Sequence, residues 1–170
     1  MDNFFYHVPT EIYFGKGQIS HLGERMAQLS KKVLLVYGGG SVKKTGLYDR
    51  VIAELCKAGL ESFELGGIEP NPRIDSVRKG ATLCKQEKID AILAVGGGSV
   101  IDAAKFIGAG AFYDGDPWDI VLKGQADKTV PLGTVLTMSA TGSEMNSGSV
   151  ISRQETKEKY AFYGDYPVFS

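Results

Sequence analysis

The feature that most constrains the fold is a pair of apolar runs that end in the same residues, Gly-Gly-Gly-Ser-Val. Residues 33–42 read VLLVYGGGSV, and residues 91–100 read AILAVGGGSV. Short continuous apolar runs that stop at glycine are typical of strands buried on both faces of a sheet. Each run is followed by residues with helical spacing. The sequence therefore predicts two strand–turn–helix units in which the backbone comes close to another group.

The rest of the chain continues this alternation of strands and helices. Helices are predicted at residues 18–29, 43–59, 74–87 and 99–110. Strands are predicted at residues 12–15, 31–37, 60–65, 89–95 and 130–137. A loop is predicted at residues 66–73 and a turn at residues 114–119, and two β-like runs at 147–152 and 159–163 predict a hairpin. The expected fold class is therefore α/β: a Rossmann-like, mostly parallel sheet with helices on both faces and a β-hairpin near the C-terminus, in one domain over residues 1–170.

Charge and composition exclude several classes of function. The 170 residues carry a net charge of −1, so the charge gives no indication of a basic face that would bind nucleic acid. No apolar run approaches the roughly 20 residues that a membrane span needs, and residues 1–17 lack the pattern of a secretory signal. Cys56 and Cys84 lie far apart in helical segments, which favours reduced thiols and a cytoplasmic location.

The turn at residues 96–99 predicts an anion site. The first amides of a helix have no partner within that helix, and together with the helix dipole they attract negative charge. Gly97 and Gly98 lack the Cβ atoms that would keep a phosphate away, and the hydroxyl of Ser99 can bind a phosphate oxygen. The alternative is a tight turn in which Ser99 is only the N-cap of the helix, because GGGS matches neither common phosphate-binding motif.

Asp102 follows one turn into the same helix and has two interpretations. It is either an acid on the helix surface, favoured by the dipole, or a group that faces a ligand. Since a carboxylate would repel a pyrophosphate, a functional Asp102 is expected to reach a ribose or an amide.

The turn at residues 38–41 bears on the choice between NAD and NADP. Sites for NAD usually place an acid at a strand end, where it accepts a hydrogen bond from the ribose 2′-hydroxyl. No acid occurs between residues 33 and 45, and Gly39, Gly40 and Ser41 are followed closely by two lysines. This favours NADP(H) over NAD(H). The alternative is a pair of solvated lysines in the first helical turn.

Residues 137–146, TMSATGSEMN, carry small hydroxyl side chains directly after a predicted strand. Thr137 and Thr141 could line a polar ligand, and Glu144 could form a capping box with Thr141. The alternative is an ordinary polar loop.

Together these motifs resemble the iron-containing (group III) alcohol dehydrogenase family, in particular its butanol dehydrogenase-like branch. The resemblance runs through FGKGQISHLGE, VYGGGSVKKTGLYD, IEPNPR, AVGGGSVIDAAK, GDPWD, VLTMSATGSEMN and VISRQETKEKYAF. It is most specific in the second glycine motif followed by ATGSEMN. The chain is similar to the N-terminal cofactor-binding domain of that family, and nothing in it resembles the family's second, all-α, metal-binding domain.

The resemblance implies a set of cofactor-binding residues. These are Gly39, Gly40, Ser41, Asn71, Gly97, Gly98, Ser99, Asp102, Thr137, Thr141, Asn146 and Lys159. In the family, the turn at 96–99 would hold the pyrophosphate, and the turn at 38–41 would face the adenosine ribose and any 2′-phosphate. Asn71 would lie near the adenosine portion, Asp102 towards the nicotinamide, and Lys159 at the nicotinamide ribose. Thr137, Thr141 and Asn146 would line the groove.

The family reaction is reversible hydride transfer between a primary alcohol or aldehyde and NAD(P), with iron or zinc as the Lewis acid. The family holds that metal with one aspartate and three histidines, whereas neither His7 nor His21 matches a ligand. We therefore expect no metal ligand and no catalytic residue in these 170 residues, which would be inactive alone, and a homodimer for the full-length protein. The alternatives are a free-standing nucleotide-binding module without catalysis, a structural α/β domain without a ligand, and a polyol or sugar-phosphate member of the same superfamily.

Overall fold

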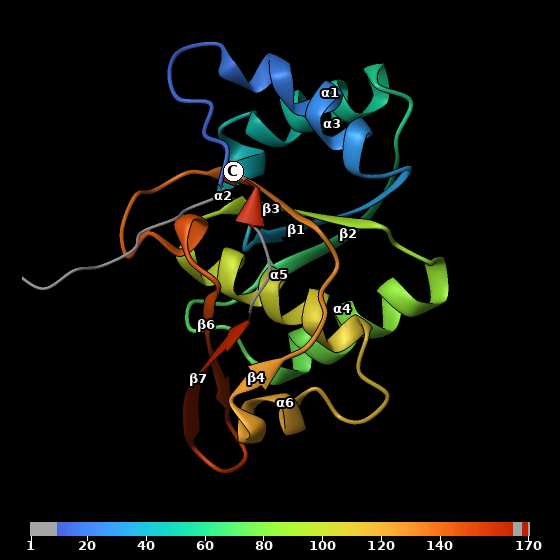
Figure 1. The fold of residues 1–170 in the computed structure, drawn as a ribbon. Coiled ribbons are helices and arrows are strands. Elements are labelled where there is room, and N and C mark those ends of the chain that lie inside the picture. Colours follow the sequence, from blue (N-terminus) through green and yellow to red (C-terminus); the bar gives the residue numbers. More distant parts are fainter. Residues whose placement is uncertain (1–9, 165–167, 170) are drawn as a thin grey trace, which may run out of the picture.

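A five-stranded sheet in the order β2-β1-β3-β5-β8 forms the centre of the molecule (Figure 1). The computed structural model describes residues 10–164 and 168–169. The strands of this sheet are β1 (Lys32–Gly38), β2 (Glu61–Ile68), β3 (Ala91–Gly96), β5 (Leu132–Leu136) and β8 (Val168–Phe169). Each strand runs parallel to its neighbours, as the alternation of strands and helices predicts.

Helices cover both faces of this sheet (Figure 1). One face carries η1 (Gln18–His21), α1 (Leu22–Leu29), α2 (Ser41–Lys44) and α3 (Leu47–Lys57), and the other carries α4 (Ile74–Glu87) and α5 (Gly98–Ala111). Alternate residues of β1 enter two separate cores: Val33 and Leu35 belong to the core beneath α1 and α3, and Leu34 and Val36 to the core beneath α4 and α5. A strand buried on both faces needs apolar residues at every position, which explains the continuous run in the sequence.

The predicted hairpin is confirmed. It consists of β6 (Gly148–Arg153) and β7 (Glu158–Gly164), which pair antiparallel, and the short strand β4 (Gln125–Ala126) joins β7 to give a second sheet. Phe162 of β7 is fully buried, and its ring centroid lies 4.5 Å from that of Phe106 on α5. The hairpin is thereby fixed on the helix that begins at the second glycine turn.

The predicted strand at residues 12–15 is wrong. No strand covers these residues in the described part of the chain, and the side chain of Phe14 is 95% exposed. A strand must exchange backbone hydrogen bonds with a neighbouring strand. The free edge of β5 is paired with β8, and residues 12–15 pair with no strand in the described part of the chain.

Three further boundaries differ from the sequence prediction. The helix predicted at 43–59 is divided into α2 and α3, because Gly46 takes a φ of 71° as the N-cap of α3. β2 continues to Ile68 instead of ending at residue 65, and a Cβ on its Gly66 would lie only 2.6 Å from the ring of Tyr37. The predicted turn at 114–119 leads into a helix, α6 (Trp118–Lys123), which at six residues is too short to show a clear period.

Within residues 10–164, no helix is both long and apolar enough to cross a lipid bilayer.

Candidate functional site

The amino end of α5 presents free backbone amides at the carboxyl end of β3. Gly97 is the N-cap, with φ −90° and ψ −174°, and Gly98 is the first helical residue. The alternative in which Ser99 is the N-cap of the helix is therefore wrong, since Ser99 lies inside the first turn. In the part of the chain that the structure describes, no backbone acceptor takes a hydrogen bond from the amides of Gly98 or Ser99. This end of α5 can therefore donate to a bound anion.

The three glycines of this turn serve different purposes. A Cβ on Gly96 would lie 2.6 Å from Cγ2 of Val100, so this glycine is required for packing. A Cβ on Gly97 would meet no atom within 4 Å, and one on Gly98 would lie 3.6 Å from Oγ1 of Thr141. The space over Gly97 is therefore open, and a phosphate group fits the cradle that a side chain there would fill.

The first glycine turn lies at the same edge of the sheet, because β1 and β3 are parallel neighbours. Gly39 is exposed, and Gly40 takes a φ of 118° as the N-cap of α2. A Cβ on either residue would meet no atom within 4 Å. Ser41, the first residue of α2, is exposed beside this open space.

A cluster of polar side chains that sequence reasoning missed lies beside the first turn. Glu64 of β2 accepts hydrogen bonds from the hydroxyls of Tyr37, at 2.7 Å, and Tyr48. The ammonium of Lys43 lies 3.8 Å from the Glu64 carboxylate and 4.4 Å from the centroid of the Tyr48 ring. The two phenols lower the pKa of Glu64, and the bond to Glu64 raises the pKa of Tyr48 to about 12. Glu64 is thus an acid near this turn, supplied by the neighbouring strand.

Asn71, Ser99 and Lys159, which lie far apart in the sequence, come together. Asn71 has a positive φ of 54° in the turn between β2 and α4. Its backbone amide donates to Oγ of Ser99 at 3.4 Å, and its side-chain oxygen accepts from Nζ of Lys159 at 2.7 Å. Three of the residues that the resemblance implies therefore form one connected group at the amino end of α5.

Asp102 is engaged by the segment that leads into the hairpin. Its carboxylate accepts from Oγ of Ser143 at 2.6 Å and from the backbone amide of Val150 at 3.1 Å. Its backbone carbonyl accepts from Oγ of Ser149 at 2.8 Å. The structure thus gives Asp102 a role in joining α5 to η2 (Ser143–Met145) and β6.

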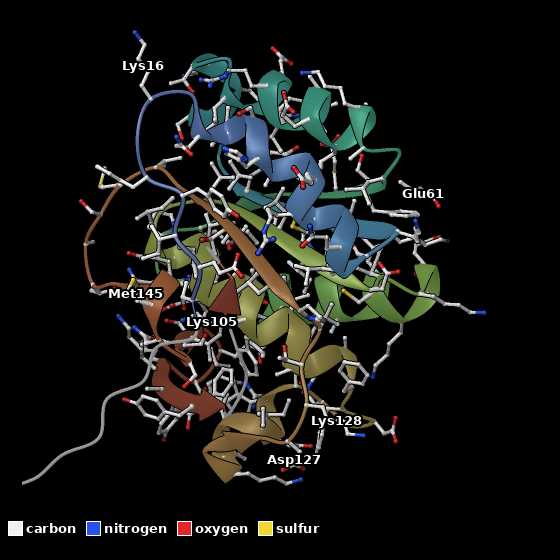
Figure 2. The ribbon with its side chains drawn as sticks, turned by 45° about the horizontal axis from the view of Figure 1, so that its top comes forward. Lys16, Glu61, Lys105, Asp127, Lys128 and Met145 are labelled. Carbon is white, nitrogen blue, oxygen red and sulfur yellow. The ribbon has the colours of Figure 1, made fainter. Side chains whose placement is uncertain are left out.

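Asn146 and Lys105 form a second connection between the same two parts of the chain. Nζ of Lys105 donates to the backbone oxygen of Asn146 at 3.0 Å, to its side-chain oxygen at 3.3 Å, and to the backbone oxygen of Gly148. Lys105 is 1% exposed, and burial lowers its pKa to about 8 although Asp102 opposes the shift. In Figure 2, Lys105 lies within the body of the molecule, whereas Lys16 projects from its edge. Sequence reasoning missed Lys105, because its position three residues after Asp102 is that of an ordinary surface ion pair.

Thr137 and Thr141 lie on the segment that follows β5. The backbone amide of Thr137 donates to the carbonyl of Gly96 at 3.0 Å, which places this segment directly beside the second turn. Both threonines are exposed. Thr137 also borders a cavity of about 1110 Å³ between β5, α1 and residues 11–16, whose walls include Ile12, Phe14 and Met26. None of the residues that line this apolar cavity belongs to α5, so it is not the anion site.

The described residues do not fit a metal ion. Within residues 10–164 and 168–169, no group of three or more His, Cys, Asp or Glu side chains is arranged to hold one. The ring of His21 packs against that of Tyr13, with centroids 5.0 Å apart. His7 lies outside the described residues.

Comparisons with known proteins agree with this architecture. The family model described as iron-containing alcohol dehydrogenase matches residues 9–170. Over 173 residues, the chain is 57% identical to the probable NADH-dependent butanol dehydrogenase 1 of Bacillus subtilis (strain 168), covering 100% of this chain and 45% of that protein. Over 176 residues, it is 47% identical to the NADPH-dependent aldehyde reductase YqhD of Escherichia coli (strain K12), again covering 100% of this chain and 45% of that protein.

A solved structure gives the same result for the fold. The NADH-dependent butanol dehydrogenase A of Thermotoga maritima superposes with a TM-score of 0.96 at 47% identity, covering 100% of this chain and 44% of that one. The α/β fold class is therefore confirmed. The chain spans less than half the length of these relatives.

Proposed function

Because the chain belongs to the iron-containing alcohol dehydrogenase family, we propose that it is the dinucleotide-binding half of an NAD(P)-dependent alcohol dehydrogenase. The reaction of the complete enzyme would be hydride transfer between a primary alcohol or aldehyde and the cofactor. The names of two relatives, an NADH-dependent butanol dehydrogenase and an NADPH-dependent aldehyde reductase, support this reaction class. The observation that carries the proposal is the pair of free amides beneath the open space at Gly97.

Each proposed contact follows from the order β1-β3-β5 at one edge of the sheet. The amides of Gly98 and Ser99 would bind the pyrophosphate at the start of α5. On the β1 side, Gly39, Gly40 and Ser41 would face the adenosine ribose. On the β5 side, the segment with Thr137, Thr141 and Asn146 would face the nicotinamide half. Asn71, Asp102 and Lys159 complete the proposed site.

The bound cofactor supplies or accepts the hydride, and the residues of this chain hold it in place. The amides of α5 would hold the pyrophosphate, and the segment after β5 would hold the nicotinamide half. Lys159 is held by Asn71 beside Ser99, and in this position it can donate to a ribose hydroxyl. The family is described as iron-containing, but the described residues do not fit a metal, so no step of the reaction is assigned to one. We propose that these 170 residues bind the cofactor without appreciable turnover.

We propose that NADP(H) is preferred to NAD(H), because small residues and a hydroxyl stand at the end of β1, and the acid that β2 brings near this turn, Glu64, is paired with Lys43. Ser41→Asp tests this preference. Isothermal titration of the 170-residue chain should give a lower Kd for NADPH than for NADH, and the substitution should reverse that order. Equal losses of affinity for NADPH and NADH would contradict the role of Ser41 in the proposed preference for NADP(H).

Gly97→Ala tests the anion site itself. The new methyl group would enter the open space where we place the pyrophosphate, so NADPH affinity should fall about tenfold with an unchanged melting temperature. Wild-type affinity in the variant would contradict the site. Butyraldehyde reduction at an ordinary rate by the 170-residue chain, with or without iron or zinc, would contradict the proposal that these residues bind the cofactor without appreciable turnover.

The alternative is a nucleotide-binding module without catalysis, and the 57% identity to a relative named as a probable butanol dehydrogenase favours the dehydrogenase. We further propose a cytoplasmic location and a homodimer for the complete protein. Two free cysteines, Cys56 and Cys84, support the reducing location. Light scattering of the full-length protein would test the dimer.

A further inference from the structure

Lys105 is a fully buried lysine, and among the residues that the structure describes its hydrogen bonds all go to one short segment. The side chain of Lys105 is 0% exposed, and its ammonium donates to oxygens of Asn146 and Gly148. An ammonium has three protons, and three acceptors surround it. Burying a charged group is costly unless it is paired and hydrogen-bonded, so this arrangement needs a compensating benefit.

Asp102 extends the connection from the same face of α5. It lies one turn before Lys105, with Oδ1 3.9 Å from the ammonium, and it accepts hydrogen bonds from Ser143 and Val150. Residues 143–150 are therefore joined to α5 by a lysine that donates and an aspartate that accepts. We call this pair of side chains, Asp102 and Lys105, the α5 clamp.

The α5 clamp holds one wall of the proposed groove and not the other. The segment after β5 lies beside the second turn, where Thr141 is next to Gly98 and Thr137 donates to Gly96. The first turn follows β1, on the opposite side of β3. Because the pyrophosphate would lie between them, the clamped wall faces the nicotinamide half and the unclamped turn faces the adenosine half.

Within the clamped wall, regular structure is limited to the three-residue η2 and the start of β6. If Lys105 were replaced by an apolar residue, the backbone oxygens of Asn146 and Gly148 would lose the ammonium as a partner, while Oδ1 of Asn146 would keep its bond from the amide of Gly148. Such oxygens would turn towards water, and the wall would move away from α5. An exposed ligand-binding segment is thus held in place from beneath.

We propose that Lys105 is a positioning residue that sets the nicotinamide wall of the cofactor groove. This inference rests on the proposed function. Lys105 is buried and acts through Asn146 and Gly148, without touching the cofactor. Its loss should therefore weaken contacts to the nicotinamide half and spare contacts to the adenosine half.

The test compares two ligands on the 170-residue chain, NADPH and 2′-phospho-ADP-ribose, which lacks the nicotinamide ring. For Lys105→Met, we expect the Kd for NADPH to rise about tenfold and the Kd for 2′-phospho-ADP-ribose to change less than about twofold. The matched control is Lys85→Met, since Lys85 also donates to a backbone carbonyl, that of Tyr113, away from the groove. The control should leave both Kd values unchanged.

Ser143→Ala keeps the test open where the methionine variant does not fold, because it removes one bond to Asp102 and no buried charge. It should weaken NADPH binding less, with the same selectivity. Equal losses for the two ligands, or no loss for either, would overturn the role of Lys105 while the proposed function stands. Failure of the wild-type chain to bind either ligand would overturn both.

Discussion

The two Gly-Gly-Gly-Ser-Val turns share one sequence but differ in backbone conformation. In the first turn, the helix begins at Ser41 after Gly40 with φ 118°, and it is four residues long. In the second, the helix begins one position earlier in the motif, at Gly98, and continues for 14 residues. The valine of each motif is buried in a different core, Val42 beneath α3 and Val100 beneath α4 and α5. A repeated motif therefore specifies that a turn occurs, while the packing of its valine decides the geometry.

The lysines that follow the two turns differ in the same way. Lys43 lies in an exposed helical turn, where hydrogen bonding to Tyr37 is the main cause of its raised pKa. Lys105 is buried beneath the hairpin, where desolvation lowers its pKa to about 8. A partly exposed ion pair therefore lies beside the first turn, whereas a buried charge holds the segment next to the second.

The largest expected effect concerns the first glycine of each motif. Gly96→Ala should reduce the free energy of unfolding by about 1–3 kcal/mol, since its Cβ would lie 2.6 Å from Val100 and the helix cannot retreat. Gly38→Ala is the matched control, because its nearest atoms would be at 3.5 and 3.7 Å, and it should change stability by less than about 0.5 kcal/mol. Urea unfolding measures both. Equal costs would mean that the two turns are packed alike.

Substituting the third glycine of each motif should cause backbone strain in the first turn and none in the second. Gly40→Ala should cost about 1–2 kcal/mol, because its φ of 118° is unfavourable for a residue with a Cβ. Gly98→Ala has no such cost, since Gly98 is helical and its Cβ would make ordinary contact with Thr141. Thermal unfolding of the two variants checks this difference. An equally stable Gly40→Ala protein would contradict the positive φ.

The smallest effect is a dependence on pH that comes from Lys105. Its pKa is lowered from 10.5 to about 8 on folding, so above pH 8 the unfolded chain binds more protons than the folded one. This contribution to stability is fully present above the unfolded pKa and is lost as the pH falls through the folded pKa. Stability should rise by about 1 kcal/mol between about pH 7.5 and 9 relative to Lys105→Met.

The pH comparison needs the Lys105→Met variant because other groups change protonation state in the same pH range. Burial raises the pKa of Cys84 to about 12, and this lowers the stability of both proteins as the unfolded thiol ionises. The difference between the two proteins cancels that effect. Parallel curves of stability against pH would show that Lys105 is as easily protonated as a solvated lysine.

The sequence by itself determined the buried strands, their glycine turns and the hairpin, because each depends on local spacing. The continuous apolar residues 33–37 of β1 and 91–95 of β3 require burial on two faces, and glycine at 97 and 98 leaves the amides of α5 accessible. The tertiary structure alone decided which distant residues meet. Asn71 and Lys159 are 88 positions apart, and Glu64 reaches the first turn from a neighbouring strand.

Local sequence pattern also could not predict which segments lack a neighbouring strand or which charged side chains become buried. Residues 12–15 have the composition of a strand but pair with no strand in the described part of the chain, so they form none. Lys105, three residues after Asp102, has the spacing of an ordinary surface ion pair. It is buried because the segment at 143–150 and the hairpin cover that face of α5, and the chain forms that cover from residues about 40 positions away.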